Sequence, residues 1–377
     1  VFLRHDVLIE AAGVEFVALA ASAVYVLARR TGLDERAAAF ASLIYVLTPG
    51  FHLSATSCLN DAPAAAMALT VAALLAGRAS WGAIAVAAAL GVGIKPTAGF
   101  ALSGFLLLAW LTRAEERRRS GRGLALAAAA VVVGAFWYAR NLLWFGSPFY
   151  PLGSDVENPV AVQLGPRLGS LGANLGDLLS GRLLDPAATG ANVDHGAGWG
   201  AAAVGLGLIG LLLQLREEPR LRALAAAFGV SLLTTLTFTQ NDPWCLKYAF
   251  FFPALLAIAA AGWAARSKPA AGLAALAVVV CLAATTLPYD LPWTSFQALA
   301  RQPVKTRSAL TLWADDVPDD AVGCRGGFET RSYLLYRPDF SRRVVYLRGN
   351  DVGDVLHVYG EGRGDAPAGR QLYRTRR

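Results

Sequence analysis

Residues 81–112 read WGAIAVAAALGVGIKPTAGFALSGFLLLAWLT, and this stretch decides how the chain is arranged. As a single helix it would be about 48 Å long at 1.5 Å per residue, whereas the apolar core of a membrane is about 30 Å thick. Pro96 lacks a backbone donor and disfavours the helical conformation at the preceding residue, Lys95. The stretch therefore predicts two short helices that meet at Lys95.

The rest of the chain has the same apolar character. Of its 377 residues, 55% are hydrophobic and only 16% are charged, whereas a soluble domain carries about 25% charged residues. The mean hydropathy is +0.44. Recurring apolar runs predict an all-α polytopic membrane protein with about ten spans. The runs lie at roughly 7–28, 37–50, 61–77, 81–94, 96–112, 124–145, 198–215, 221–238, 246–264 and 269–287.

Basic residues are concentrated in every second gap between these runs. They are Arg29, Arg30 and Arg36; Arg78; Arg113, Arg117, Arg118, Arg119 and Arg122; Arg216, Arg220 and Arg222; and Arg266 with Lys268. The positive-inside rule requires this alternation, and it holds only if 81–112 is broken at Lys95. Lys95 is then expected at the outer face. The net charge of +7 therefore reflects membrane topology and indicates no nucleic-acid partner.

The charge pattern also predicts two domains. Residues 1–287 form the transmembrane domain, with a long external loop at 146–197, and residues 288–377 form a small extracytoplasmic α/β domain. Within the second domain we expect short strands at 321–324 and 342–348 on either side of a helix around 329–336. The four cysteines are scattered without metal-ligand spacing, so no metal site is predicted.

Polar groups collect at the helix ends that this topology places outside. The candidate site residues are His5, Asp6, Asn60, Asp61, Lys95, Arg140, Asn141, Lys247 and Tyr248. Ionisable groups at membrane depth are costly and often mark a functional site. A mixed set of acids and bases beside a large external loop predicts an outward-facing active site.

Each of these residues also has a structural interpretation. Asn60 or Asp61 would cap the helix that begins near residue 62, where a carboxylate complements the helix dipole. The side chain of Lys95 would extend to the interface, and Arg140 and Lys247 would anchor lipid headgroups. For the isolated residues, the structural and the functional interpretations both remain open.

Four short stretches, taken in order, resemble a known family. WYARNLLWFGSPFYP (137–151) resembles the WYxRNxxxxGNPxYP-like stretch of bacterial membrane glycosyltransferases with the GT-C fold, relatives of protein O-mannosyltransferases and of the aminoarabinose lipid A transferase. LNDAP (59–63), GVGIKPT (91–97) and CLKYAFFFPAL (245–255) resemble further family positions in the same order. The resemblance covers about residues 1–287 and implies a GT-C-like helical bundle.

The resemblance implies transfer of a sugar from a polyprenyl-phosphate donor to a lipid, glycan or protein acceptor of the cell envelope. Cations would stabilise the leaving phosphate, and a carboxylate would serve as the base. By that logic Lys95, Arg140 and Lys247 are expected to bind the donor phosphate. Asp61 would face the acceptor or the sugar, or would orient one of those cations. Asp6 is a second candidate acid.

Asn60, Asn141, Tyr248 and His5 are expected to support the site. In the family the main catalytic Asp lies in the first external loop, before the segment that matches residues 7–28. The chain begins with Val1, so we expect this fragment to lack that loop. No covalently bound cofactor is expected, and the need for a divalent metal is left open.

The expected location is the plasma membrane, with the site and the C-terminal domain on the extracytoplasmic side. The expected partners are membrane lipids, the lipid-linked donor and the acceptor. One alternative is a transporter or flippase, which would place charges near helix midpoints and repeat its broken helices in two halves. The others are a polymerase or ligase of envelope polysaccharide and a scaffold without enzymatic activity.

Overall fold

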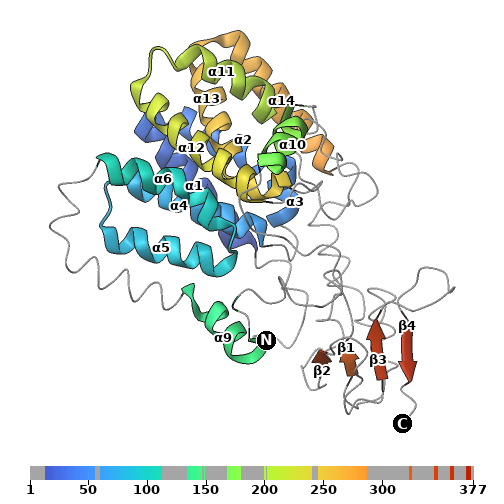
Figure 1. Ribbon diagram of the computed structural model, residues 1–377. Helices are drawn as coiled ribbons and strands as arrows, with labels where there is room; N and C mark the ends of the chain where they lie inside the picture. Colours follow the sequence, from blue (N-terminus) through green and yellow to red (C-terminus); the bar gives the residue numbers. More distant parts are fainter. Residues whose placement is uncertain are drawn as a thin grey trace. The chain divides into compact units, whose positions relative to one another are not determined.

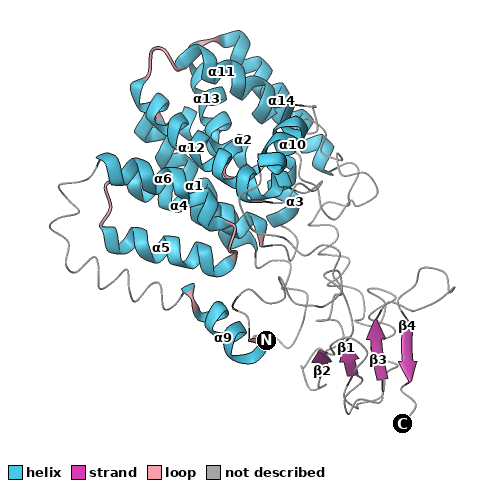
Figure 2. Ribbon diagram, viewed as in Figure 1, coloured by secondary structure: helices cyan, strands magenta, loops and turns pink. Residues whose placement is uncertain are grey.

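The computed structural model describes residues 13–55, 60–112, 134–146, 148, 168–179, 199–200, 202–239, 245–286 and four short strands between 322 and 374. The chain forms two compact units, one of residues 10–150 and 162–289 and the other of residues 1–9, 151–161 and 290–377. The described part of the first unit is helical, and the described part of the second consists of strands (Figures 1 and 2).

The described helices of the first unit correspond closely to the apolar runs. They are α1 (Val14–Thr31), α2 (Glu35–Val46), α3 (Pro49–Ala55), α4 (Asp61–Ala76), α5 (Trp81–Ile94), α6 (Ala98–Thr112), α9 (Phe136–Phe145), α10 (Leu168–Leu179), the π-helical turn η4 (Ala202–Leu206), α11 (Gly207–Gln214), α12 (Pro219–Phe238), the 3₁₀ turn η5 (Cys245–Ala249), α13 (Phe252–Arg266) and α14 (Lys268–Thr286). The break that Pro96 predicts is confirmed, because α5 ends at Ile94 and α6 begins at Ala98.

Two predicted segments differ from the structure. The first apolar run was expected to end at 28, but α1 continues to Thr31, with Arg29 and Arg30 in its last turn and Gly32 ending it at a φ of 101°. Basic residues there complement the helix dipole, and glycine adopts this left-handed conformation readily. The expected loop at 146–197 contains α10, whose leucines recur every three or four residues and form one apolar face.

The helix lengths support only part of the expected membrane topology. Among the described residues, Pro219–Phe238 is the one helix that is long and apolar enough to cross a membrane. Six further apolar helices have 10–17 residues. Of the expected span 124–145, only the end is described, as α9. The number of membrane crossings, about ten, therefore remains a prediction.

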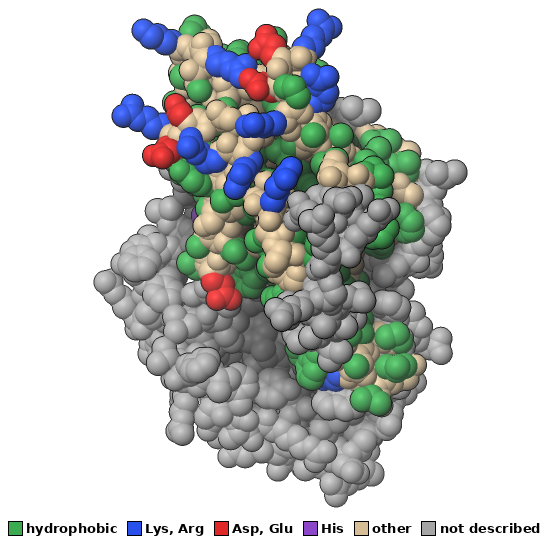
Figure 3. Space-filling view, turned by 90° about the vertical axis from the view of Figure 1, so that its left-hand side faces the viewer, with side chains coloured by type: hydrophobic (Ala, Val, Ile, Leu, Met, Phe, Trp, Pro, Cys, Tyr) green, Lys and Arg blue, Asp and Glu red, His purple; other side chains and the backbone are tan. Residues whose placement is uncertain are grey.

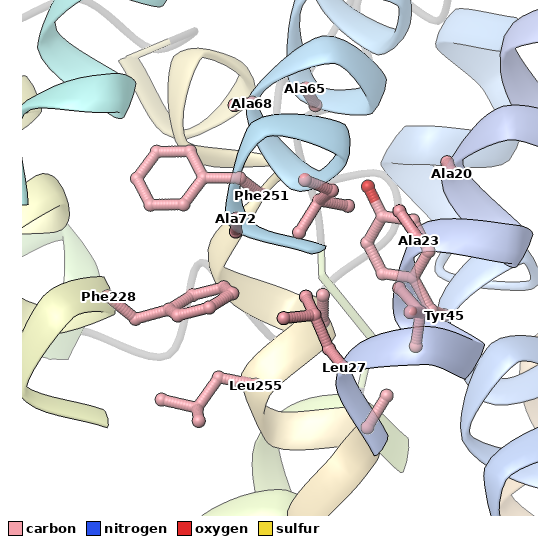
Figure 4. Packing of buried hydrophobic residues seen from close by; sticks show 14 of the residues in the cluster. Ala20, Ala23, Leu27, Tyr45, Ala65, Ala68, Ala72, Phe228, Phe251 and Leu255 are labelled. Carbon is pink, nitrogen blue, oxygen red and sulfur yellow. The ribbon is translucent and has the colours of Figure 1, made fainter. Parts of the chain in front are cut away.

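The core of the helical unit lies around α4 and α13, which are apolar on every side. Alanine makes up about half of each helix and allows neighbouring helices to approach closely. Figure 4 shows Ala65, Ala68 and Ala72 of α4 beside larger side chains that include Phe228 and Phe251. The rings of Phe228 and Phe251 lie 6.1 Å apart between centroids. The largest side chains of the core thus fill the space that the alanines leave.

Glycines allow α11 to lie directly on α13. A Cβ atom on Gly207 would lie 2.5 Å from Leu256 Cβ, and one on Gly210 would lie 2.5 Å from the Ala259 carbonyl oxygen. These separations exclude a larger side chain at either position, so glycine sets the distance between the two helices.

Large apolar side chains also cover the outside of the helical unit. Those exposed on α5, α6, α11, α12 and α14 are Val86, Leu90, Leu107, Trp110, Leu111, Leu208, Ile209, Leu212, Leu213, Val230, Leu233, Leu273, Leu276 and Val279. A soluble protein seldom exposes so many large apolar side chains, whereas lipid tails solvate them readily. The apolar exterior is consistent with a helical membrane protein.

The described strands of the second unit form one small mixed sheet in the order β2-β1-β3-β4. The strands are β1 (Val322–Cys324), β2 (Val344–Tyr346), β3 (His357–Gly360) and β4 (Gln371–Arg374). β1 is parallel to both β2 and β3, and β3 is antiparallel to β4. Two parallel strands need a crossover connection between them. The helix expected around 329–336 falls in that connection but lies outside the described residues, so the α/β domain remains a prediction.

Candidate functional site

Exposed basic side chains gather at one end of the helical unit, which we call the arginine end. It comprises Arg29, Arg30, Arg36, Arg78, Arg216, Arg220, Arg222, Arg266 and Lys268, all exposed. A pocket lined by Thr31, Gly32, Leu33, Gln214, Glu218, Leu221, Ile258 and Arg266 shows that three of the basic loops meet here. Figure 3 shows this concentration of Lys and Arg side chains in its upper part. The described loops that the charge pattern assigned to one side of the membrane thus share one end of the unit, and the predicted basic loop at 113–122 lies outside the described residues.

The opposite end of α4 holds a buried carboxylate. Asp61 is the first residue of α4, and its side chain is only 2% exposed. Asn60 occupies the N-cap position but makes no side-chain cap hydrogen bond. Instead, the Ala62 N–H donates to Ser54 Oγ of α3 at 3.1 Å. A side-chain cap by Asn60 was therefore wrong, and Ser54 binds the first turn in its place. Asp61 remains favourably placed at the positive end of the helix dipole.

The carboxylate of Asp61 is bound by two lysines from distant parts of the chain. Lys95 Nζ, at the break between α5 and α6, donates to Asp61 Oδ1. Lys247 Nζ, in η5, lies 4.0 Å from Asp61 Oδ2. The two lysine side chains are 17% and 9% exposed, respectively. Both cations are thus held at one acid away from bulk water.

An aromatic ring completes this group, which we call the acid–lysine cluster (Asp61, Lys95, Lys247 and Tyr248). Lys95 Nζ lies 4.6 Å and Lys247 Nζ lies 5.7 Å from the centroid of the Tyr248 ring. Cations are attracted to the face of an aromatic ring at such distances. The side chains of the cluster carry two positive charges and one negative charge, an arrangement able to receive an anion.

Two buried side chains donate hydrogen bonds to backbone carbonyl oxygens in and next to η5, the turn that carries Lys247. Tyr45 Oη donates to the Phe250 carbonyl oxygen at 3.2 Å, and Trp199 Nε1 donates to the Leu246 carbonyl oxygen at 3.3 Å. Both side chains are almost completely buried. The turn that presents Lys247 and Tyr248 is therefore anchored on either side.

The other predicted site residues are distributed differently. Asn60 Nδ2 donates to the Ile94 carbonyl oxygen at 3.2 Å, directly before Lys95. Arg140 lies on α9, where Nη1 donates to Asn141 Oδ1 at 3.5 Å and the guanidinium stacks over Trp137 at 5.2 Å. Within the described residues, neither Arg140 nor Asn141 bonds to the acid–lysine cluster. His5 and Asp6 lie outside the described residues.

The sequence analysis missed three residues that support this end of the unit. Ser54 binds the start of α4, Trp199 holds η5, and Tyr138 Oη donates to the Val92 carbonyl oxygen at 2.6 Å. Tyr138 sits in an aromatic-rich segment that is typical of a membrane-interface belt, whereas Trp199 is the one aromatic residue of the glycine- and alanine-rich stretch 196–205. Neither pattern indicates which carbonyl the side chain reaches.

His52 of α3 is the remaining titratable group of note at this end. Burial lowers the pKa of its imidazole from the ordinary value of 6.5, because desolvation disfavours the charged form. The part of the chain that the structure describes contains no group of three or more His, Cys, Asp or Glu side chains able to hold a metal ion.

Comparison with known proteins supports the membrane assignment. Residues 9–313 match the model of a family described as predicted membrane protein (DUF2079), a description that names a location and no reaction. No curated protein and no solved structure matches the chain. Because the match covers most of the sequence, the chain belongs to the DUF2079 family of predicted membrane proteins.

Proposed function

We propose that the protein is an integral membrane glycosyltransferase. It moves a sugar from a polyprenyl-phosphate donor to a lipid, glycan or protein acceptor of the cell envelope, on the outer face of the plasma membrane. The observation that carries the proposal is the acid–lysine cluster, in which two lysines from separate segments converge on one buried acid. The motif resemblance supplies the reaction class.

The chemistry of such a transfer fits the charges of the cluster. When the acceptor hydroxyl oxygen forms a bond to the anomeric carbon, it gives up its proton to a base, the bond from that carbon to the phosphate oxygen breaks, and negative charge accumulates on the leaving phosphate. Cations already held in place stabilise that charge without reorganising. Lys95 and Lys247 are the two such cations, and Tyr248 lies against both. The lysines therefore bind the donor phosphate in the proposed reaction.

Asp61 acts in this proposal through the lysines. Its carboxylate is 2% exposed and is engaged with Lys95 on one oxygen and near Lys247 on the other. A carboxylate so occupied is poorly placed to take a proton from an acceptor hydroxyl. Of the roles expected for Asp61, orienting the two cations is the one that its geometry favours. The cations of the arginine end, by contrast, are exposed to solvent and lie at the opposite end of the helical unit from Asp61.

Binding of undecaprenyl phosphate to the purified protein in nanodiscs tests the proposal. Lys247→Met should weaken binding about 10- to 100-fold, because a hydrogen bond to a charged group contributes about 1.5–3 kcal/mol. Lys95→Met should act in the same direction. Lys268→Met is the matched control, because Lys268 is an exposed lysine at the arginine end and should leave the affinity unchanged.

Undecaprenol, which lacks the phosphate, should bind the unaltered protein poorly. Equal binding of undecaprenol and undecaprenyl phosphate would refute the phosphate role of the cluster. A loss of affinity as large in Lys268→Met as in Lys247→Met would do so too. Lys247→Met leaves the closer bond between Lys95 and Asp61 in place, which makes it the variant better suited to remain folded.

A further inference from the structure

The break between α5 and α6 leaves carbonyl groups without their helical donors. In a continuous helix the N–H of residue 96 would donate to the carbonyl of Val92, four residues earlier, but a proline has no N–H. The N–H of Ala98 would likewise reach Ile94, but it donates to the Lys95 carbonyl at 3.0 Å. Unpaired carbonyls are costly at membrane depth, so both groups need other donors.

Side chains from two other helices supply these donors. Tyr138 Oη of α9 donates to the Val92 carbonyl oxygen at 2.6 Å, where Pro96 has no N–H to offer. Asn60 Nδ2 donates to the Ile94 carbonyl oxygen at 3.2 Å. Each of these two carbonyls thus receives one side-chain hydrogen bond, and each bond ties α5 to a different neighbour.

These bonds fix the residue from which the lysine of the cluster extends. Lys95 has an extended backbone, with φ −154° and ψ 129°, and its N–H makes the last helical bond of α5, to the Gly91 carbonyl. The Val92 and Ile94 carbonyls lie three residues and one residue before it. A shift of this end of α5 would therefore move the ammonium of Lys95 relative to Asp61.

We infer that Tyr138 is a positioning residue for Lys95: its hydroxyl replaces the donor that Pro96 removes and so holds the broken end of α5 in register with Asp61. The inference deepens the proposed function and rests on it for the role of Lys95 in binding phosphate. The pairing of Tyr138 with the proline-induced break is itself independent of any ligand. It also gives α9 a role beyond that of an aromatic membrane anchor.

A double-mutant cycle between Tyr138→Phe and Pro96→Ala tests the pairing. Tyr138→Phe should lower the apparent melting temperature in detergent by roughly 2–4 °C, the shift expected from loss of about one hydrogen bond. In the Pro96→Ala background, residue 96 regains an N–H and Lys95 is released from the restriction that a following proline imposes, so this helix end can extend and bond to the Val92 carbonyl. Tyr138→Phe should then have little effect. An equal loss in both backgrounds would overturn the inference.

Tyr25→Phe is the matched control. Tyr25 of α1 is partly buried, and its hydroxyl makes no hydrogen bond with any described residue. This variant should leave the melting temperature unchanged in both backgrounds. Any loss in Tyr25→Phe equal to that in Tyr138→Phe would show a general effect of removing a tyrosine hydroxyl, and the inference would fall.

Affinity for undecaprenyl phosphate separates positioning from stability. Tyr138→Phe should weaken binding about 3- to 10-fold, whereas Tyr25→Phe should not. If Tyr138→Phe lowers the melting temperature and leaves the affinity unchanged while Lys95→Met weakens binding, Tyr138 is structural only and the inference is refuted. If Lys95→Met also leaves the affinity unchanged, the proposed function fails, and the melting cycle still decides whether Tyr138 pairs with the break.

Discussion

At the arginine end, Arg266 bonds to Glu217 and Glu218 through side chains that are 42%, 69% and 34% exposed. At the opposite end, Asp61 and Lys247 keep only 2% and 9% of their side-chain surface exposed. Ion pairs in water contribute little to stability, whereas buried charges cost desolvation energy that their partners must offset. The charges of the arginine end therefore cost little desolvation energy, whereas those of the acid–lysine cluster depend on one another to offset theirs.

The largest expected effect comes from removing the acid of the cluster. Asp61→Ala leaves two buried cations without their common counter-ion and should destabilise the protein by about 3–5 kcal/mol. Glu218→Ala, its counterpart at the arginine end, should cost less than about 1 kcal/mol. Denaturation of both variants in mixed micelles measures the difference. Equal costs would show that the two ends do not differ in the way that their exposure indicates.

A smaller effect is expected from the coupling within each pair. In a double-mutant cycle of Asp61→Ala and Lys95→Met, the double variant should lose less unfolding free energy than the two single variants together, by about 0.5–3 kcal/mol. The reason is that the second change removes a cation that the first left unpaired. The matching cycle of Glu218→Ala and Arg266→Met should give a coupling near zero, because water screens the exposed charges. A coupling at the arginine end as large as that at the cluster would contradict the comparison.

The sequence could predict the features of this contrast that depend on neighbouring residues, but not those that depend on residues far apart in the chain. Charge alternation and Pro96 are local signals, and they predicted both the break at Lys95 and the loops that share the arginine end. The meeting of Asp61 with Lys95 and Lys247 depends on how separate helices pack, which no local pattern encodes. The sequence could place these residues at helix ends on one face, but it could not show that both lysines share one carboxylate.

The misses have the same physical origin. Asn60 had the residue type of a helix cap, but the packing of α3 brought Ser54 to the first turn of α4 instead. Tyr138 lies in an aromatic-rich segment whose composition is typical of a membrane interface. Its bond to Val92 follows from the position of α9 against α5, which is a property of tertiary packing. Residue type thus predicted that these groups need partners, and packing determined which partners they have.

The smallest expected effect is a dependence of stability on pH, which arises from a histidine at the cluster end. His52 lies in α3, on which α4 packs at the cluster end, and burial lowers the pKa of its imidazole from 6.5. The unfolded chain therefore binds the proton more readily than the native protein. Stability attributable to His52 is complete above pH 6.5 and falls as the pH drops from there toward the lowered pKa.

His52→Gln should remove this part of the pH dependence. The unfolding free energy of the unaltered protein should fall relative to that of the variant between about pH 6.5 and 5, with a slope of at most about 1.4 kcal/mol per pH unit, the limit for one proton. Above pH 7.5 the difference between the two proteins should be constant. The exposed arginines of the other end remain charged over this whole range, so they add nothing to the slope. Parallel curves for the two proteins across the range would mean that His52 titrates as it does in water, and the desolvated character of this end would then be confined to the acid–lysine cluster.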